Sequence, residues 1–169
     1  MALAALLAVA TGCSRNEFED RTAVLVVGGE STTLAVDSCG LDGTTVFVVG
    51  RGPGGVVVQA VVGVEDDERT GIPASTGLTV DGASWANETP NSGVLADSYG
   101  ASGAESWSRR GQSGRAPGSI TSAVIRGSRI QVAGRLEPLT PDGTVVPGPA
   151  SDVPRIPFRL DARCDEAGS

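Results

Sequence analysis

Residues 44–64 read TTVFVVGRGPGGVVVQAVVGV, in which two runs of mostly β-branched residues flank a segment rich in glycine. Valine and threonine favour extended backbone, whereas Gly-Pro-Gly-Gly favours a turn. The stretch therefore predicts two antiparallel strands, residues 44–49 and 56–64, joined by a short loop.

The same pattern recurs on both sides of this hairpin. In residues 129–136, Ile130, Val132 and Gly134 alternate with polar or small residues, which is the period of a half-buried strand. Further runs of strand length lie at residues 22–27, 33–36, 120–125 and 157–162. Seven or eight short strands separated by glycine-rich turns predict an all-β domain, either a mostly antiparallel β-sandwich or a small open barrel with long loops.

Residues 81–119 depart from this pattern because they are rich in Gly, Ser, Asn and Ala. We expect long loops there, with one short strand or helical turn at most. Trp85, Tyr99 and Trp107 all lie in this region. Two interpretations stay open: the aromatic side chains fill the core under the loops, or they form a contact surface for a lipid, a glycan or a protein.

The length of 169 residues suits one domain. The formal net charge is −7, and all 13 positive residues are arginines, scattered singly apart from Arg109 and Arg110. No basic stripe is visible in the sequence, so nucleic acid is not an expected partner. The absence of lysine and the abundance of Ala, Gly and Val are typical of a GC-rich coding sequence, such as an actinobacterial one.

The chain contains no histidine. Ser-His-Asp and Cys-His catalysis and the usual catalytic zinc ligands are therefore excluded, and we expect no enzyme, no cofactor and no metal. The acidic run at residues 65–68 lacks the spacing of a calcium loop. The glycine-rich residues 50–55 lack the Lys-Ser/Thr pair of a phosphate loop. We interpret both as loops between strands.

The N-terminal region predicts export and lipidation. An apolar stretch leads into Ala10-Thr11-Gly12-Cys13, the small residues and cysteine of a bacterial lipobox. We expect a lipoprotein signal peptide at residues 1–12, lipid on Cys13, a charged acylated tether at 13–21 and a single β domain at 22–166. Two acyl chains on one residue anchor a protein stably in the cell membrane, on its extracytoplasmic face. The alternatives are a plain secretory signal or a buried N-terminal helix with an incidental cysteine.

Cys39 and Cys164 remain once Cys13 is assigned to lipid. An even pair in an oxidising compartment predicts a disulfide, which would tie an early strand to the last one. Two unpaired buried thiols are the alternative.

The order of these features resembles the mycobacterial nineteen-kilodalton lipoprotein antigen family. The resemblance rests on Cys13, the valine-rich strand ending in glycine at residues 26–29, residues 39–49, the strand at 130–134 and the closing strand into Cys164. It implies a surface-exposed lipoprotein of the cell envelope that innate receptors sense through its acylated N-terminus, with no established reaction.

Two functions follow as hypotheses. The first is an envelope surface antigen or interaction protein without catalytic activity, with an envelope lipid, glycan or protein as its partner. The second is a lipid or glycolipid carrier, which requires an enclosed apolar cavity of roughly several hundred Å³. Few large apolar residues are present, so we prefer the first.

Overall fold

The computed structural model describes residues 21–65, 72–82, 98–147 and 153–164. These residues form nine strands, a 3₁₀ turn and one short helix. In chain order they are β1 (Thr22–Val27), β2 (Glu30–Asp42), β3 (Thr45–Arg51), η1 (Pro53–Gly55), β4 (Val57–Gly63), β5 (Gly77–Asp81), β6 (Ser98–Ser102), α1 (Ala104–Arg109), β7 (Ser119–Arg126), β8 (Arg129–Leu139) and β9 (Ile156–Arg163).

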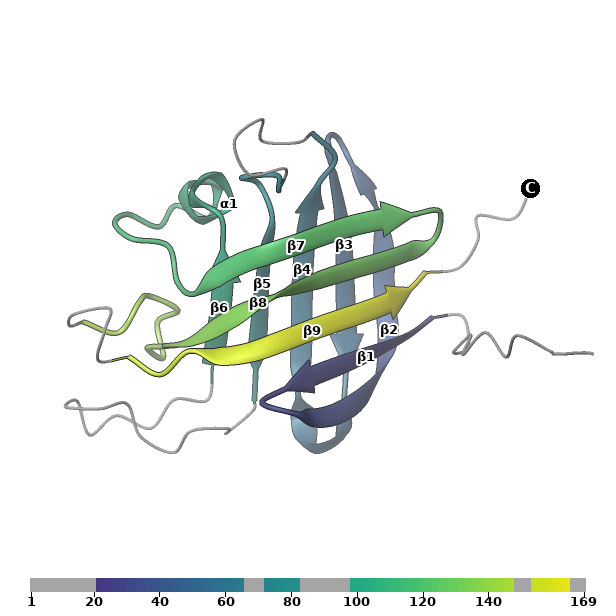
Figure 1. Cartoon of the computed structure of the whole chain (residues 1–169), viewed down its shortest axis with the longest axis horizontal. Coiled ribbons are helices and arrows are strands. Elements are labelled where there is room, and N and C mark those ends of the chain that lie inside the picture. Colours follow the sequence, from purple (N-terminus) through teal and green to yellow (C-terminus); the bar gives the residue numbers. More distant parts are fainter. Residues whose placement is uncertain (1–20, 66–71, 83–97, 148–152, 165–169) are drawn as a thin grey trace, which may run out of the picture.

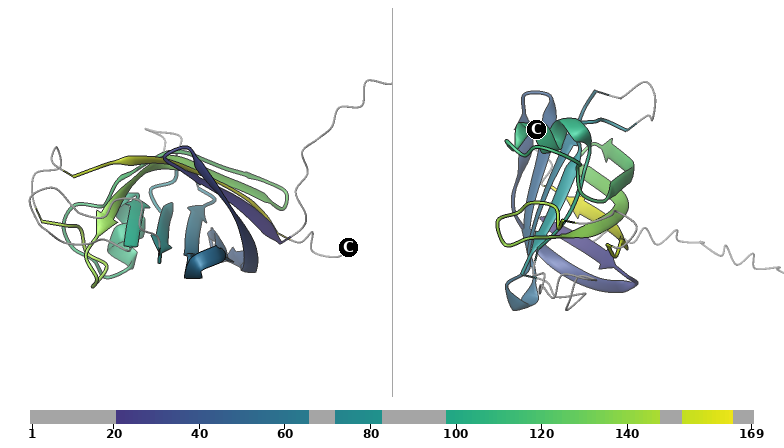
Figure 2. Two further views of the ribbon diagram at one scale, coloured as in Figure 1. Left: turned by 90° about the horizontal axis from the view of Figure 1, so that it is seen from below. Right: turned by 90° about the vertical axis from the view of Figure 1, so that its left-hand side faces the viewer.

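The strands form one antiparallel sheet that closes into a barrel. The order is β6-β5-β4-β3-β2-β1-β9-β8-β7, and β6 also pairs with β8. In Figure 1, β1, β9, β8 and β7 form a front layer that crosses β2 to β6 behind it. Figure 2 shows the sheet curving round on itself. The predicted all-β antiparallel class is therefore confirmed, with the barrel as its architecture.

Closure of the barrel depends on the length of β8. Residues 129–135 of this strand pair with β7, whereas Glu137, Pro138 and Leu139 pair with β6. One long strand thus serves two neighbours along the same edge, and β7 is an extra strand outside the eight-stranded ring. The sequence predicted a β-sandwich or an open barrel, whereas the barrel in the structure is closed. Closure could not be predicted because residues far away in the chain decide which strand pairs with the end of β8.

The barrel interior is filled by side chains. Alternate residues of each strand point inward, and most of the buried apolar residues form one cluster. Its largest member is Tyr99, whose side chain is fully buried. Barrels of about eight strands are either filled by side chains or hold one small ligand, and here the buried side chains occupy the interior.

Seven predicted strands are confirmed, with shifts of a few residues at their ends. The strand predicted at 33–36 is the middle of the longer β2, which continues past an irregularity between Val36 and Ser38. The strand β5 was not predicted, because only two of its residues are large and apolar. The expectation for residues 81–119 is wrong, since both β6 and α1 lie there. The Gly/Ser-rich β6 owes its conformation to pairing with β5 and β8 rather than to propensity.

Candidate functional site

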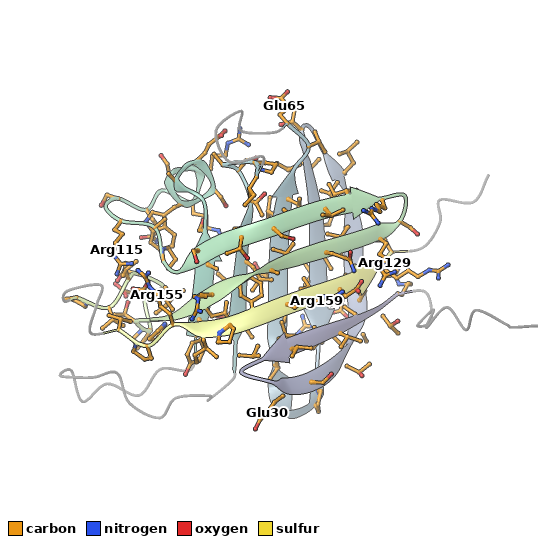
Figure 3. The ribbon with its side chains drawn as sticks, viewed as in Figure 1. Glu30, Glu65, Arg115, Arg129, Arg155 and Arg159 are labelled. Carbon is orange, nitrogen blue, oxygen red and sulfur yellow. A yellow bond between two sulfur atoms is a disulfide. The ribbon has the colours of Figure 1, made fainter. Side chains whose placement is uncertain are left out.

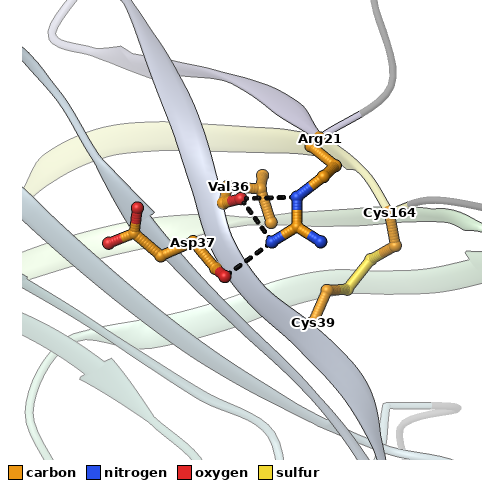
Figure 4. Close-up of a disulfide and its surroundings, with 5 residues drawn as sticks. All are labelled: Arg21, Val36, Asp37, Cys39 and Cys164. Carbon is orange, nitrogen blue, oxygen red and sulfur yellow. Dashed lines mark hydrogen bonds between the residues drawn. A yellow bond between two sulfur atoms is a disulfide. The ribbon is translucent and has the colours of Figure 1, made fainter.

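The disulfide predicted from the sequence is present between Cys39 and Cys164 (Figure 4). The two Cα atoms are 5.8 Å apart, within the range of ordinary disulfides, although 125 residues separate them in sequence. Cys39 lies in β2, and Cys164 follows β9 directly. The strand β1 pairs with both of these strands and begins at Thr22, so the bond joins β2 and β9 just beyond that beginning.

Arg21 fastens the start of the described chain to the same end of the barrel. Its guanidinium donates hydrogen bonds to the carbonyl oxygens of Val36, at 3.1 and 3.2 Å, and of Asp37, at 2.6 Å (Figure 4). The backbone N–H of Val36 in turn donates to the carbonyl of Arg21. These carbonyls are available because the β2–β3 pairing is irregular at this point. The segment that leads back to Cys13 therefore joins the barrel beside the disulfide, while Cys13 itself lies outside the described residues.

A buried carboxylate, Glu137, lies where β8 changes partner from β7 to β6. Its side chain is fully buried and accepts two hydrogen bonds from Arg115 and one of 2.8 Å from the backbone N–H of Gly118. Arg155 lies 3.9 Å away. Burial raises the pKa of Glu137, but the hydrogen bonds and the two arginine charges outweigh it and hold the pKa below its ordinary value. The group is therefore ionised near neutral pH and unsuited to donating a proton.

Asp161 is the second buried carboxylate. It accepts hydrogen bonds from Arg129, at 2.6 and 2.8 Å, and from Gln131 at 2.7 Å, while Arg159 lies 3.6 Å away. Burial raises its pKa, and these partners lower it by more. Sequence reasoning missed both carboxylates. The sequence offered one weak signal. Arg129 and Gln131 occupy polar positions of the alternating strand, which indicates an acidic side chain on a neighbouring strand without saying which one.

The three aromatic residues do not come together as one described surface. Tyr99 lies inside the barrel, and Trp107 of α1 is 3% exposed on its outside. Trp85 lies outside the described residues. Tyr99 agrees with the core interpretation, because it belongs to the core cluster, whereas Trp107 is buried outside that cluster.

A polar cavity of about 320 Å³ adjoins Trp107 on the outer side of the barrel. Its lining includes Gln59, Thr79, Asp81, Arg110 and Asp142. Desolvation lowers the pKa of Arg110, although the charge of Asp81 opposes the shift. The indole N–H of Trp107 is buried without a hydrogen-bond partner among the described residues. A lining with this many polar groups does not suit a lipid tail.

The remaining sequence candidates behave as connections. Residues 50–55 form the end of β3 and the turn η1 that leads to β4, as predicted. Of the acidic run, Glu65 is exposed and residues 66–68 lie outside the described part of the chain. Within that part, no group of three or more potential ligand side chains is arranged to hold a metal ion.

No protein-family model and no curated protein matches this chain. In the described segments, no helix has the length and apolar character needed to cross a bilayer.

Proposed function

We propose that this protein is a lipid-anchored protein of the cell envelope, held on the extracytoplasmic face by acylated Cys13 and acting through its surface rather than by catalysis. The observation that carries the proposal is the Cys39–Cys164 disulfide. Disulfides persist in exported proteins and are rare in the reducing cytosol. An exported chain whose remaining cysteine follows small residues after an apolar leader has the features of a bacterial lipoprotein.

The filled barrel supports a surface role over the alternative of a lipid or glycolipid carrier. Such a carrier needs an apolar cavity, whereas the interior of this barrel is occupied by Tyr99 and by valine and leucine side chains that pack as one cluster. Emptying that interior would cost stability in proportion to the cavity left behind.

The chemistry of the two buried acids supports a non-catalytic role. Glu137 and Asp161 are each paired with arginine, and their lowered pKa values keep them charged near neutral pH. Without histidine in the chain, a serine nucleophile lacks its ordinary base. The likeness to the nineteen-kilodalton lipoprotein family fits the same proposal.

Metabolic labelling with a fatty acid, in a bacterium that acylates lipoproteins, tests the anchor. The wild-type protein is expected to carry the label and to fractionate with membranes, and Cys13→Ala is expected to lose both. The matched control is the double variant Cys39→Ala/Cys164→Ala, which should keep the label because it retains Cys13. A wild-type protein found in the membrane without label would contradict the proposal.

A further inference from the structure

The outer face of β7, β8 and β9 gathers arginines that are scattered along the sequence. We call it the arginine face. Outward positions alternate with the buried ones, so the odd-numbered residues of β8 and β9 point away from the core. The charged members of this face are Arg126, Arg129, Arg135, Arg159, Arg163, Asp161 and, at one end, Glu137, which is covered by Arg115. Five strand arginines thus stand against two acids, of which Glu137 is already paired with Arg115, in a chain whose net charge is −7.

Strand register places three of these arginines in one row. Arg129 lies directly opposite Arg163 on β9 and directly opposite Arg126 on β7. Side chains at such opposed positions have Cβ atoms about 5 Å apart, and like charges there destabilise a sheet. Asp161 offsets part of this repulsion through its ion pair with Arg129, and an anionic partner outside the protein would offset more of it.

Asp161, the acid nearest these arginines, does not neutralise the whole face. Asp161 is held by Arg129 and Gln131, with Arg159 at 3.6 Å, and its own exposure is only 8%. The arginine side chains remain accessible beside it: Arg129 is 47% exposed and Arg159 is 63% exposed. Figure 3 shows both on the front layer, whereas the labelled acids Glu30 and Glu65 lie at opposite rims of the molecule.

The arginine face continues to the point where the chain joins the barrel. Its neighbour β1 contributes only the uncharged residues Thr22, Val24 and Val26 on this side, opposite Arg163, Asp161 and Arg159 in turn. Arg21, which precedes β1, is bound to β2 beside the disulfide. An extended tether from residue 13 to residue 20 reaches roughly 28 Å, about the length of β9, so an anchored barrel can lay this face on the bilayer.

We propose that the arginine face docks on the anionic phospholipid headgroups of the membrane that anchors the protein. This inference rests on the proposed acylation of Cys13, because the tether supplies the proximity that makes weak electrostatic docking effective. Guanidinium groups bind phosphate oxygens in a bidentate manner, and basic side chains near an anionic leaflet each strengthen membrane binding. Docking would orient the barrel with β2 to β6 facing away from the lipid.

Vesicle sedimentation tests the inference with the mature chain, residues 13–169, carrying Cys13→Ser so that no acyl chain contributes. Every strand that the structure describes lies after residue 20, so the missing leader and lipid remove none of these strands. Binding is expected to vesicles of equimolar phosphatidylcholine and phosphatidylglycerol, and not to phosphatidylcholine alone. Added salt should release the protein, because screening weakens exposed charges.

A pair of triple variants separates the face from net charge. Arg126→Gln/Arg135→Gln/Arg159→Gln removes three positive charges from the arginine face, and Arg51→Gln/Arg109→Gln/Arg110→Gln removes three from elsewhere. The first should lose affinity by about fivefold per arginine, roughly a hundredfold in all, and the second much less. An equal loss in both would overturn the proposal, since net charge alone would then explain binding.

Two other occupants are distinguished by the same assay. Binding of wild type to heparin or DNA, with none to anionic vesicles, would overturn the proposal in favour of a soluble polyanion. A further outcome is vesicle binding that is absent in the wild type and appears only in the variant Glu17→Gln/Glu19→Gln/Asp20→Asn. That result would overturn the proposal, because the chain's own acidic tether would then be the occupant of the arginine face. The assay involves no acylation, so a labelled Cys13 with no vesicle binding refutes this inference alone.

Discussion

Glu137 illustrates how a buried charge can hold irregular segments in place. The carboxylate accepts hydrogen bonds from Arg115 and from the backbone N–H of Gly118, both in the loop before β7. Arg155, in the segment before β9, lies near it. A buried carboxylate without such partners would be strongly destabilising. The ion pair therefore fastens two connections to the outer surface of the barrel.

Replacing Glu137 with Gln should lower the free energy of unfolding by about 2–4 kcal/mol, because Arg115 then lacks its counter-charge. The effect is below that of a fully buried pair because the Arg115 side chain is 38% exposed. Urea denaturation measures the difference. Glu105→Gln is the matched control: its pair with Arg109 is exposed at both ends, so its cost should stay within about 0.5 kcal/mol. Similar losses in the two variants would contradict the role assigned to Glu137.

The same carboxylate gives the stability a defined pH dependence. The folded pKa of Glu137 lies below its unfolded value, so its contribution is present above about pH 4 and is lost as the pH falls through the folded pKa. Asp161 acts in the same direction. Denaturation midpoints measured between neutral and acidic pH should fall less steeply below about pH 4 in Glu137→Gln than in the wild type.

The strand β8 is central to the fold, since it pairs with three other strands, β6, β7 and β9. Gly118, just before β7, lies at the junction of these strands. A Cβ atom there would overlap the carbonyl oxygen of Arg135 and approach that of Gly100 to 2.8 Å. Only glycine lets the chain pass between β6 and β8 on its way into β7.

Gly118→Ala should therefore destabilise the protein by about 2–4 kcal/mol, because it adds a steric overlap to the strain of a positive φ. The variant Gly127→Ala measures the cost of a positive φ without a steric overlap. Gly127 has a φ of 56°, nearly equal to the 55° of Gly118, but a Cβ there meets nothing within 4 Å. Its cost should be about 1 kcal/mol. Thermal unfolding of the two variants checks the ranking, and equal shifts would show that the junction tolerates a side chain.

The molecule as a whole is a closed ring of strands whose first and last members are neighbours. The strand β1 pairs with β9, and the disulfide joins β2 to the residue after β9. The covalent bond thus closes almost the entire described chain into one loop. In the unfolded state this constraint removes conformational freedom that folding would otherwise have to overcome.

Reduction of the disulfide should lower the free energy of unfolding by about 2–5 kcal/mol. Denaturation of residues 13–169 carrying Cys13→Ser, with and without a reductant, measures the change, and mass analysis under non-reducing conditions should find no free thiol. Cys39→Ala/Cys164→Ala should match the reduced protein and no longer respond to the reductant. A folded wild-type protein with two reactive thiols would refute the bridge.

The all-β class, the antiparallel hairpins and the Cys39–Cys164 pair were predictable from residues alone. Strand alternation is local, and once Cys13 is predicted to carry lipid, the three cysteines leave only one pairing. The closure of the barrel through β6 and β8, the burial of Glu137 and the arginine face were not. Each depends on which strands lie side by side and in what register, and register is set by packing between residues far apart in the chain. Arg126 and Arg163 are isolated charges in the sequence, and the pairing of β7, β8 and β9 sets them in one row with Arg129.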